Sequence, residues 1–127
     1  MRIYRTKTFT RLARKVALKD TFICQAINEM NQGLIDADLG SGLFKKRVAM
    51  PGSGKSGSWR TLLGFKSGSR AFFLYVFTKS NQGNIQAYEL KALKKLAKFY
   101  LSLRPEDIRI VLEREELYEV KYDESQG

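Results

Sequence analysis

Three stretches in the middle of the chain predict a small antiparallel sheet, and this pattern limits the possible folds more than any other feature of the sequence. Residues 43–49 alternate between two faces, as a β-strand does. Residues 59–65 and 70–77 are rich in aromatic and aliphatic side chains, and the short segment between them contains the glycine and serine that a hairpin turn favours. Together the three stretches predict a three-stranded meander.

Helical periodicity lies on both sides of this predicted sheet. Apolar residues recur at helical spacing over 9–16 and 22–30, which predicts two short N-terminal helices. The same spacing over 85–101 predicts a longer helix, and Pro105 suits the first turn of another. We expect an α+β protein with one domain over residues 1–127, in which two N-terminal helices pack on a small antiparallel sheet and a C-terminal helix follows.

The charge of the chain is large and unevenly distributed. The net charge is +10, and eight basic residues but no acidic one lie between Leu39 and Tyr88. Such a field favours a polyanion as the partner, because binding releases counterions. Residues 104–127 form an acidic C-terminal extension, within which residues 117–122 alternate as an edge strand would. This extension either folds over the basic face or lengthens the sheet, and the sequence leaves both open.

Several kinds of site are excluded by what the sequence lacks. The chain has no histidine and one cysteine, Cys24. A histidine-based catalytic triad and an internal disulfide are therefore impossible, and a zinc site is disfavoured, so we expect neither a metal nor another cofactor. No apolar run approaches the roughly 18 residues that cross a bilayer, and no secretory signal is visible, so we expect a cytoplasmic protein without a membrane partner.

The Gly-rich loop of residues 51–58 superficially matches a phosphate-binding loop, because it contains Gly-Lys-Ser at 54–56. That motif needs a further glycine five residues before Gly54, where this chain has Ala49. It also runs from a strand into a helix, whereas a strand is expected after this loop. A nucleotide-hydrolysing function is therefore disfavoured.

A group of basic residues offers a better account of the middle of the chain. An antiparallel meander can bring them around one concave face, and they are Lys45, Arg47, Lys55, Arg60 and Lys79. RNA carries its own nucleophile, the 2′-hydroxyl, so fixed cations that align it and stabilise the phosphorane suffice for cleavage without histidine or metal. Lys55 or Lys45 can serve as the base if neighbouring cations lower its pKa. The alternative is a passive face that binds nucleic acid without cutting it.

Two motifs in this region resemble the HigB branch of the RelE/ParE toxin superfamily. The first is Gly-Leu-x-Lys-x-Arg-x-Ala, which matches residues 42–49, and the second is Gly-Lys-x-Gly-x-x-Arg, which matches residues 54–60. The aromatic strand at 70–79, which ends in lysine, and the helix that follows also resemble that branch. The resemblance covers about residues 42–101.

This resemblance implies a microbial-ribonuclease-like fold and a metal-independent endoribonuclease that cuts messenger RNA on the ribosome. It also implies a cognate antitoxin, through which alone the chain would reach operator DNA. By motif position, Lys45 and Arg47 hold phosphate, Lys55 is the base or a phosphate ligand, Arg60 stabilises the transition state, and Lys79 contacts the scissile phosphate or leaving group. Lys46 and Tyr88 are expected to contact RNA.

Two other functions are compatible with the same sequence. One is a ParE-like toxin that inhibits DNA gyrase, although such a protein does not need the clustered basic residues. The other is a non-catalytic RNA-binding module.

Overall fold

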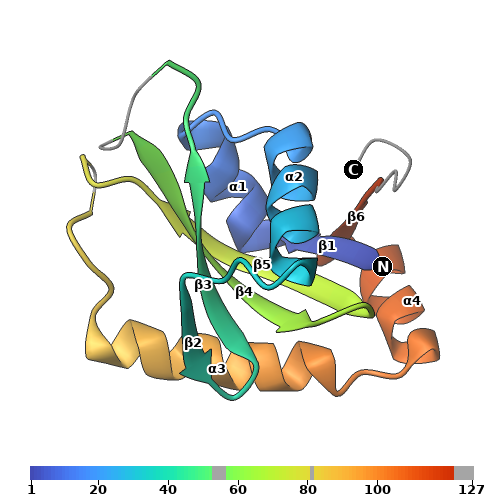
Figure 1. Ribbon diagram of the computed structural model, residues 1–127. Coiled ribbons are helices and arrows are strands. Elements are labelled where there is room, and N and C mark those ends of the chain that lie inside the picture. The colour runs from blue at the N-terminus through green and yellow to red at the C-terminus, as the bar shows by residue number, and fades with distance from the viewer. Residues whose placement is uncertain (53–56, 81, 122–127) are drawn as a thin grey trace.

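The computed structural model describes residues 1–52, 57–80 and 82–121, which form a single sheet with helices on both faces (Figure 1). In chain order the elements are β1 (Arg2–Thr6), α1 (Lys7–Lys15), α2 (Asp20–Asn31), β2 (Ala37–Gly40), β3 (Leu43–Ala49), β4 (Ser58–Lys66), β5 (Arg70–Phe77), α3 (Ala87–Leu101), α4 (Pro105–Glu113) and β6 (Leu117–Val120). Within these described residues, no helix is long and apolar enough to cross a membrane.

The sheet is larger than expected and is mixed rather than antiparallel. Its strand order is β2-β3-β4-β5-β1-β6, so the predicted meander β3-β4-β5 is confirmed as its centre. The N-terminal strand β1 was not predicted. It pairs in parallel with β5, with Ile3 opposite Ala71, and it separates β5 from β6. The α+β class is therefore confirmed, and the small antiparallel sheet is corrected to six mixed strands.

Helices cover the two faces of the sheet separately. On the face that we call the α1/α2 face, Phe9 and Ile23 pack with Leu63 of β4. On the opposite α3/α4 face, Leu93 and Ala97 of α3 pack in one cluster with buried residues of β3, β4 and β5. This division follows from the alternation of strand side chains, since neighbours along a strand point to opposite faces.

A β-bulge in β5 sets which side chains meet on the α3/α4 face. Leu63 lies opposite Phe73, yet the next residue Leu62 lies opposite Tyr75, so β5 carries one extra residue at Leu74. Because of this shift, Arg60 lies opposite Phe77. Without the extra residue, Val76 would lie opposite Arg60, and the side chain of Phe77 would point to the other face.

The acidic C-terminal segment lengthens the sheet. β6 pairs antiparallel with β1 at the sheet edge, with Val120 opposite Ile3. Arg2 of β1 holds Glu119 of β6 in two hydrogen bonds, from Nε at 2.6 Å and from Nη2 at 2.8 Å. Of the two alternatives that the sequence left open, the structure shows this one for residues 117–120.

We predict that Gly64→Val destabilises the protein and loosens α3. A Cβ atom at Gly64 would lie 3.3 Å from both Cα and Cβ of Ala97, so the larger side chain would push the helix off the sheet. Overpacking of this kind costs about 1–3 kcal/mol, measured by chemical denaturation. Ala49→Val, on an exposed strand position, is the control. Equal stability of the two variants would contradict this packing account.

Candidate functional site

A row of side chains crosses the α3/α4 face where α3 no longer covers the sheet. Arg47 of β3 lies opposite Arg60 of β4, which lies opposite Phe77 of β5. The row that α3 covers, at Leu43 and Gly64, is four residues away along β3, which is roughly 13 Å. The two arginines therefore share one open surface, which we call the cationic cup.

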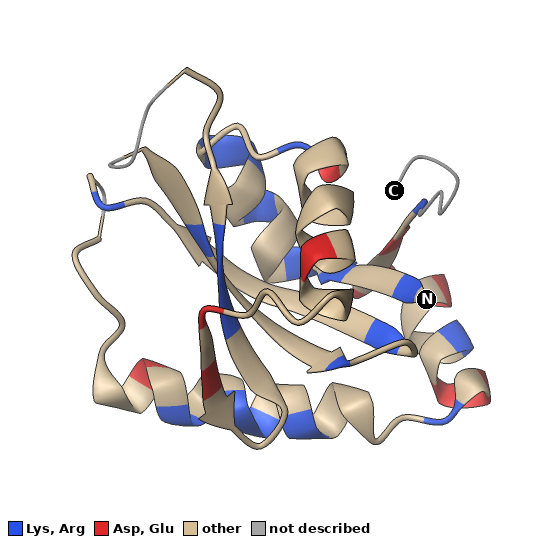
Figure 2. Cartoon of the chain, viewed as in Figure 1, with Lys and Arg blue, Asp and Glu red and all other residues tan. Residues whose placement is uncertain are grey.

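Lys45 completes the β3 side of this cup. It lies two residues before Arg47 on the same face of the strand, and it is half-buried whereas Arg47 is exposed. Neither of these two side chains, nor those of Arg60 and Lys79, forms an ion pair within the described residues. One carboxylate does lie beside the cup, because Asp36 accepts the backbone N–H of Arg47 at 2.7 Å. Figure 2 shows basic residues along β3 and β4, and acidic residues on β2 beside β3.

Arg60 is the most constrained cation of the cup. Its guanidinium carbon lies 5.9 Å from the centroid of the Phe77 ring, within the range of a cation–π contact. Its Nη1 atom is buried and has no hydrogen-bond partner among the described residues. A buried donor without a partner is rare in folded proteins and calls for an explanation such as a ligand. The Phe77 ring thus lies against a guanidinium group that has one buried donor unsatisfied by the described residues.

Lys79 lies at the same end of the sheet as the cup. It follows β5 by two residues, and it lines a pocket of about 350 Å³ with Met50, Gly57 and Ser58 at the ends of β3 and β4. The β4–β5 register explains this position, because continuing the pairing past Phe77 brings Lys79 beside Ser58. Lys55 belongs to residues 53–56, which lie outside the described residues.

Lys46 lies on the other side of the sheet from the cup. Its side chain is 7% exposed, and its Nζ forms a 2.8 Å ion pair with Glu29 of α2 and donates to the Leu34 carbonyl at 3.1 Å. The strand alternation that puts Lys45 and Arg47 on the α3/α4 face places Lys46 on the α1/α2 face. The geometry therefore argues against the predicted contact of Lys46 with RNA, and we assign it to the packing of α2.

Tyr88 and Tyr75 add two hydroxyl groups near the cup. Tyr88 is in the first turn of α3 and is 75% exposed, so its ring is accessible to a ligand. Tyr75, which the sequence analysis missed, donates to Gln82 Oε1 at 2.8 Å. The pKa of Tyr75 is raised above its usual value. Burial is the largest cause, followed by the charge and hydrogen bond of Glu89 and then by Tyr88, so the hydroxyl stays protonated.

The same hydrogen bonds fix the linker that carries Lys79. Gln82 Nε2 donates to the Asn84 carbonyl at 2.9 Å and to Glu89 Oε1 at 3.4 Å. Glu89 also accepts the backbone N–H of Gln86, which is the N-cap of α3. Tyr75 thus ties the linker between β5 and α3 to the sheet beside the cup.

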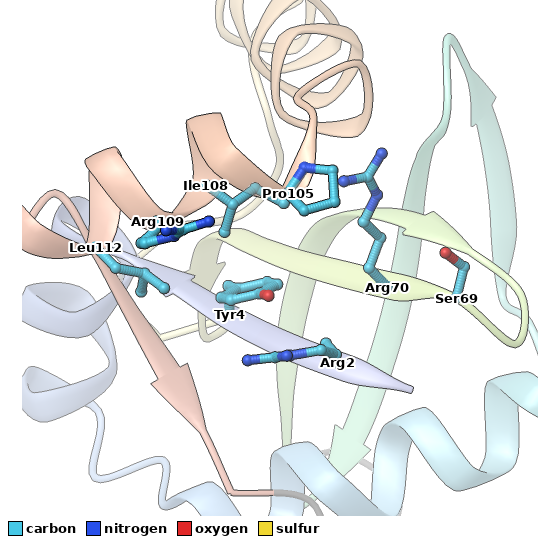
Figure 3. A pocket seen from close by; sticks show the side chains of 8 residues that line it. All are labelled: Arg2, Tyr4, Ser69, Arg70, Pro105, Ile108, Arg109 and Leu112. Carbon is cyan, nitrogen blue, oxygen red and sulfur yellow. The ribbon is translucent and has the colours of Figure 1, made fainter.

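A second basic pocket lies at the other end of the α3/α4 face, between β1, β5 and α4 (Figure 3). Its volume is about 530 Å³, and Arg2, Arg70 and Arg109 line it. Arg2 is held by Glu119, and Arg70 donates at 2.7 and 2.8 Å to two main-chain carbonyls at and just after the end of α3. Two of these three guanidinium groups therefore stabilise the fold through hydrogen bonds, whereas no hydrogen bond or ion pair of the Arg47 and Arg60 guanidinium groups is seen within the described residues.

Within the part of the chain that the structure describes, no three Cys, Asp or Glu side chains lie close enough together to hold a metal ion.

A comparison with protein families identifies the chain. The model of the RelE toxin, from the RelE/RelB toxin–antitoxin system, matches residues 1–120. The chain belongs to the RelE toxin family. This RelE-family chain is thus the toxin of a toxin–antitoxin pair, and its partner is an antitoxin. The match extends through α4 and β6 to the end of the last described strand. No curated protein sequence matches the chain.

We predict that Lys46→Ala destabilises this RelE-family toxin by about 1–3 kcal/mol, because it leaves Glu29 and the Leu34 carbonyl without their charged donor. Lys66→Ala, which removes an exposed lysine from the end of β4, is the matched control and should change the free energy of unfolding little. Chemical denaturation measures both variants. A fully stable Lys46→Ala protein with weakened RNA binding would contradict the structural role and restore the predicted RNA contact.

Proposed function

We propose that this RelE-family toxin is a ribosome-dependent messenger-RNA endonuclease of the HigB type, with the cationic cup as its active site. Toxins of this family are generally endoribonucleases. The observation that carries the proposal is the row of Arg47, Arg60 and Phe77, in which a buried guanidinium donor has no partner among the described residues. We assign no metal or cofactor to the reaction, because the substrate itself supplies the nucleophile.

In the proposed reaction the 2′-oxygen of one ribose attacks the adjacent phosphorus. A bond from that oxygen to phosphorus forms, the bond to the 5′-oxygen of the next nucleotide breaks, and the products are a 2′,3′-cyclic phosphate and a free 5′-hydroxyl. The 2′-hydroxyl proton passes to a base, and the leaving oxygen takes up a proton. The phosphorane between these states carries two negative charges, and fixed donors stabilise it most when they are already in place.

The cup residues divide these tasks according to their positions. Arg60 donates from its guanidinium group to a phosphorane oxygen, and Phe77 keeps that group in place. Arg47, exposed at the rim, binds the phosphate and aligns it. Lys79 contacts the scissile phosphate or the leaving oxygen from the end of β5.

Two assignments concern groups at the edge of the cup. The base is Lys45, on the cup face of β3, or Lys55, which lies outside the described residues. Tyr88 projects from the first turn of α3 and stacks on a base of the message. Tyr75, which is held protonated, is not the base.

We predict that Arg60→Ala lowers the rate of message cleavage in a translating extract by about 10²–10³-fold, the usual loss when one transition-state donor is removed. Arg109→Ala is the matched control, because Arg109 is an exposed arginine in the second basic pocket. Primer extension on the message locates the cuts, and a parallel reaction without ribosomes tests ribosome dependence. Thermal melting of both variants shows that each is folded.

Other outcomes would select the alternatives. Full cleavage by folded Arg60→Ala protein would contradict the role of Arg60. Ribosome-independent cuts would contradict the HigB-type activity, gyrase-dependent DNA breaks would indicate a ParE-like toxin, and RNA binding without cuts would indicate a non-catalytic module.

A further inference from the structure

An exposed apolar stripe follows the outer side of α3, away from the sheet. Tyr88, Leu96 and Phe99 are 75%, 41% and 53% exposed. With exposed Ala92 they lie at intervals of four, four and three residues, which is one side of a helix. Leu93 and Ala97, which are buried, form the opposite side against the sheet. The stripe is therefore not part of the core.

A row of lysines runs beside this stripe. Lys91, Lys95 and Lys98 are exposed and occur at intervals of four and three residues, so they form a parallel line on the same outer surface. No carboxylate of the described residues pairs with any of the three. The outer surface of α3 thus has one apolar half and one positively charged half.

We propose that this surface of α3 is a docking site for an acidic amphipathic helix of the antitoxin. An apolar face of the partner helix would cover Leu96 and Phe99, and carboxylates on its flank would meet the lysine row. Helices recognise each other in this way when apolar anchors lie at helical intervals and the charges are complementary. The net charge of +10 and the lysine row favour a partner of opposite charge at this surface.

Two other occupants fit the surface less well. A second copy of this chain would bring two rows of lysines together, and like charges at an interface oppose association. RNA would match the lysines, and it could stack on Tyr88 and Phe99. It has no group that covers the aliphatic side chains of Ala92 and Leu96, which lie between the two rings.

The location of the stripe connects docking with inhibition, a step that rests on the function proposed above. α3 begins immediately after the linker that carries Lys79, and Tyr88 lies in its first turn. A helix seated along the stripe would cover Tyr88, and the chain that continues from its end would reach the cationic cup. The antitoxin would then block access of the message without filling the core of the toxin.

The test uses the full chain and a synthetic helical peptide with leucines on one face and glutamates elsewhere. A peptide of the same composition with its leucines spread around the helix is the control probe, and an unstructured single-stranded RNA is the third probe. Fluorescence anisotropy measures binding to Leu96→Ser/Phe99→Ser and to Lys95→Glu. Ile110→Ser and Lys66→Glu are the matched controls, since Ile110 is 46% exposed on α4 and Lys66 is exposed at the end of β4.

We expect the amphipathic peptide to bind the parent chain, and each α3 variant to bind it at least about tenfold more weakly, while the two controls keep their affinity. Expression of the Leu96→Ser/Phe99→Ser variant should still arrest growth, which shows that the protein is folded and that the cup is intact. Loss of docking with arrest retained separates this proposal from the function of the cup.

Three results would overturn the proposal. One is the absence of saturable binding by the amphipathic peptide at millimolar concentration. The second is equal binding of the two peptides, because the surface would then select charge alone. The third is binding of the RNA probe, but not of the peptide, to the parent chain, together with loss of RNA binding in the Lys95→Glu variant. That result would make α3 an RNA contact.

Discussion

The pairing of β3, β4 and β5 is the constraint on which the candidate site depends. It places Arg47 directly opposite Arg60, although like charges that face each other across strands destabilise a sheet. No carboxylate of the described residues forms an ion pair with either guanidinium group, although Asp36 accepts the backbone N–H of Arg47. A phosphate group between the two would remove the repulsion, so the same arrangement that costs stability prepares an anion site. This exchange of stability for function is common at active sites.

α3 separates two groups of basic residues on one face of the sheet. Its inner side packs closely on β4, where Gly64 leaves room for Ala97. Beyond one end of the helix lie the cations of the cup, whose side chains form no ion pair within the described residues. At its other end, Arg70 binds main-chain carbonyls and Arg2 holds β6 through Glu119. The number of arginines is thus a poor guide to function, and the partners of each guanidinium are a better one.

Much of the central sheet could be predicted from the sequence because its signals are local. The alternation over residues 43–49 was enough to put Lys45 and Arg47 on one face, and the structure has β3 with those bounds. β1 was missed because Ile3 and Tyr4 stand among basic residues, and their strand is stabilised by parallel pairing with β5 and by β6, both far away in sequence. Such pairing leaves no pattern in a short window.

The site shows the same limit at the level of single residues. Lys46 and Arg47 are neighbours of the same chemical type. Strand alternation puts them on opposite faces, but only the contacts with Glu29 and the Leu34 carbonyl show that Lys46 is buried and paired. Tyr75 was missed because the bulge beside Leu74 changes its surroundings, and no sequence rule locates that extra residue. The charge pattern predicted which part of the chain would meet a polyanion, and the contacts show which of its cations form ion pairs within the described residues.

The most direct test of the cup is an NMR titration of the arginine side-chain signals with a short RNA whose 2′-hydroxyls are methylated, so that it cannot be cleaved. The account predicts that the Nε–H signals of Arg47 and Arg60 shift on addition of the RNA, while those of Arg2 and Arg70 stay in place. Shifts confined to Arg2, Arg70 and Arg109 would move the nucleic-acid site to the opposite end of the sheet and would contradict the account.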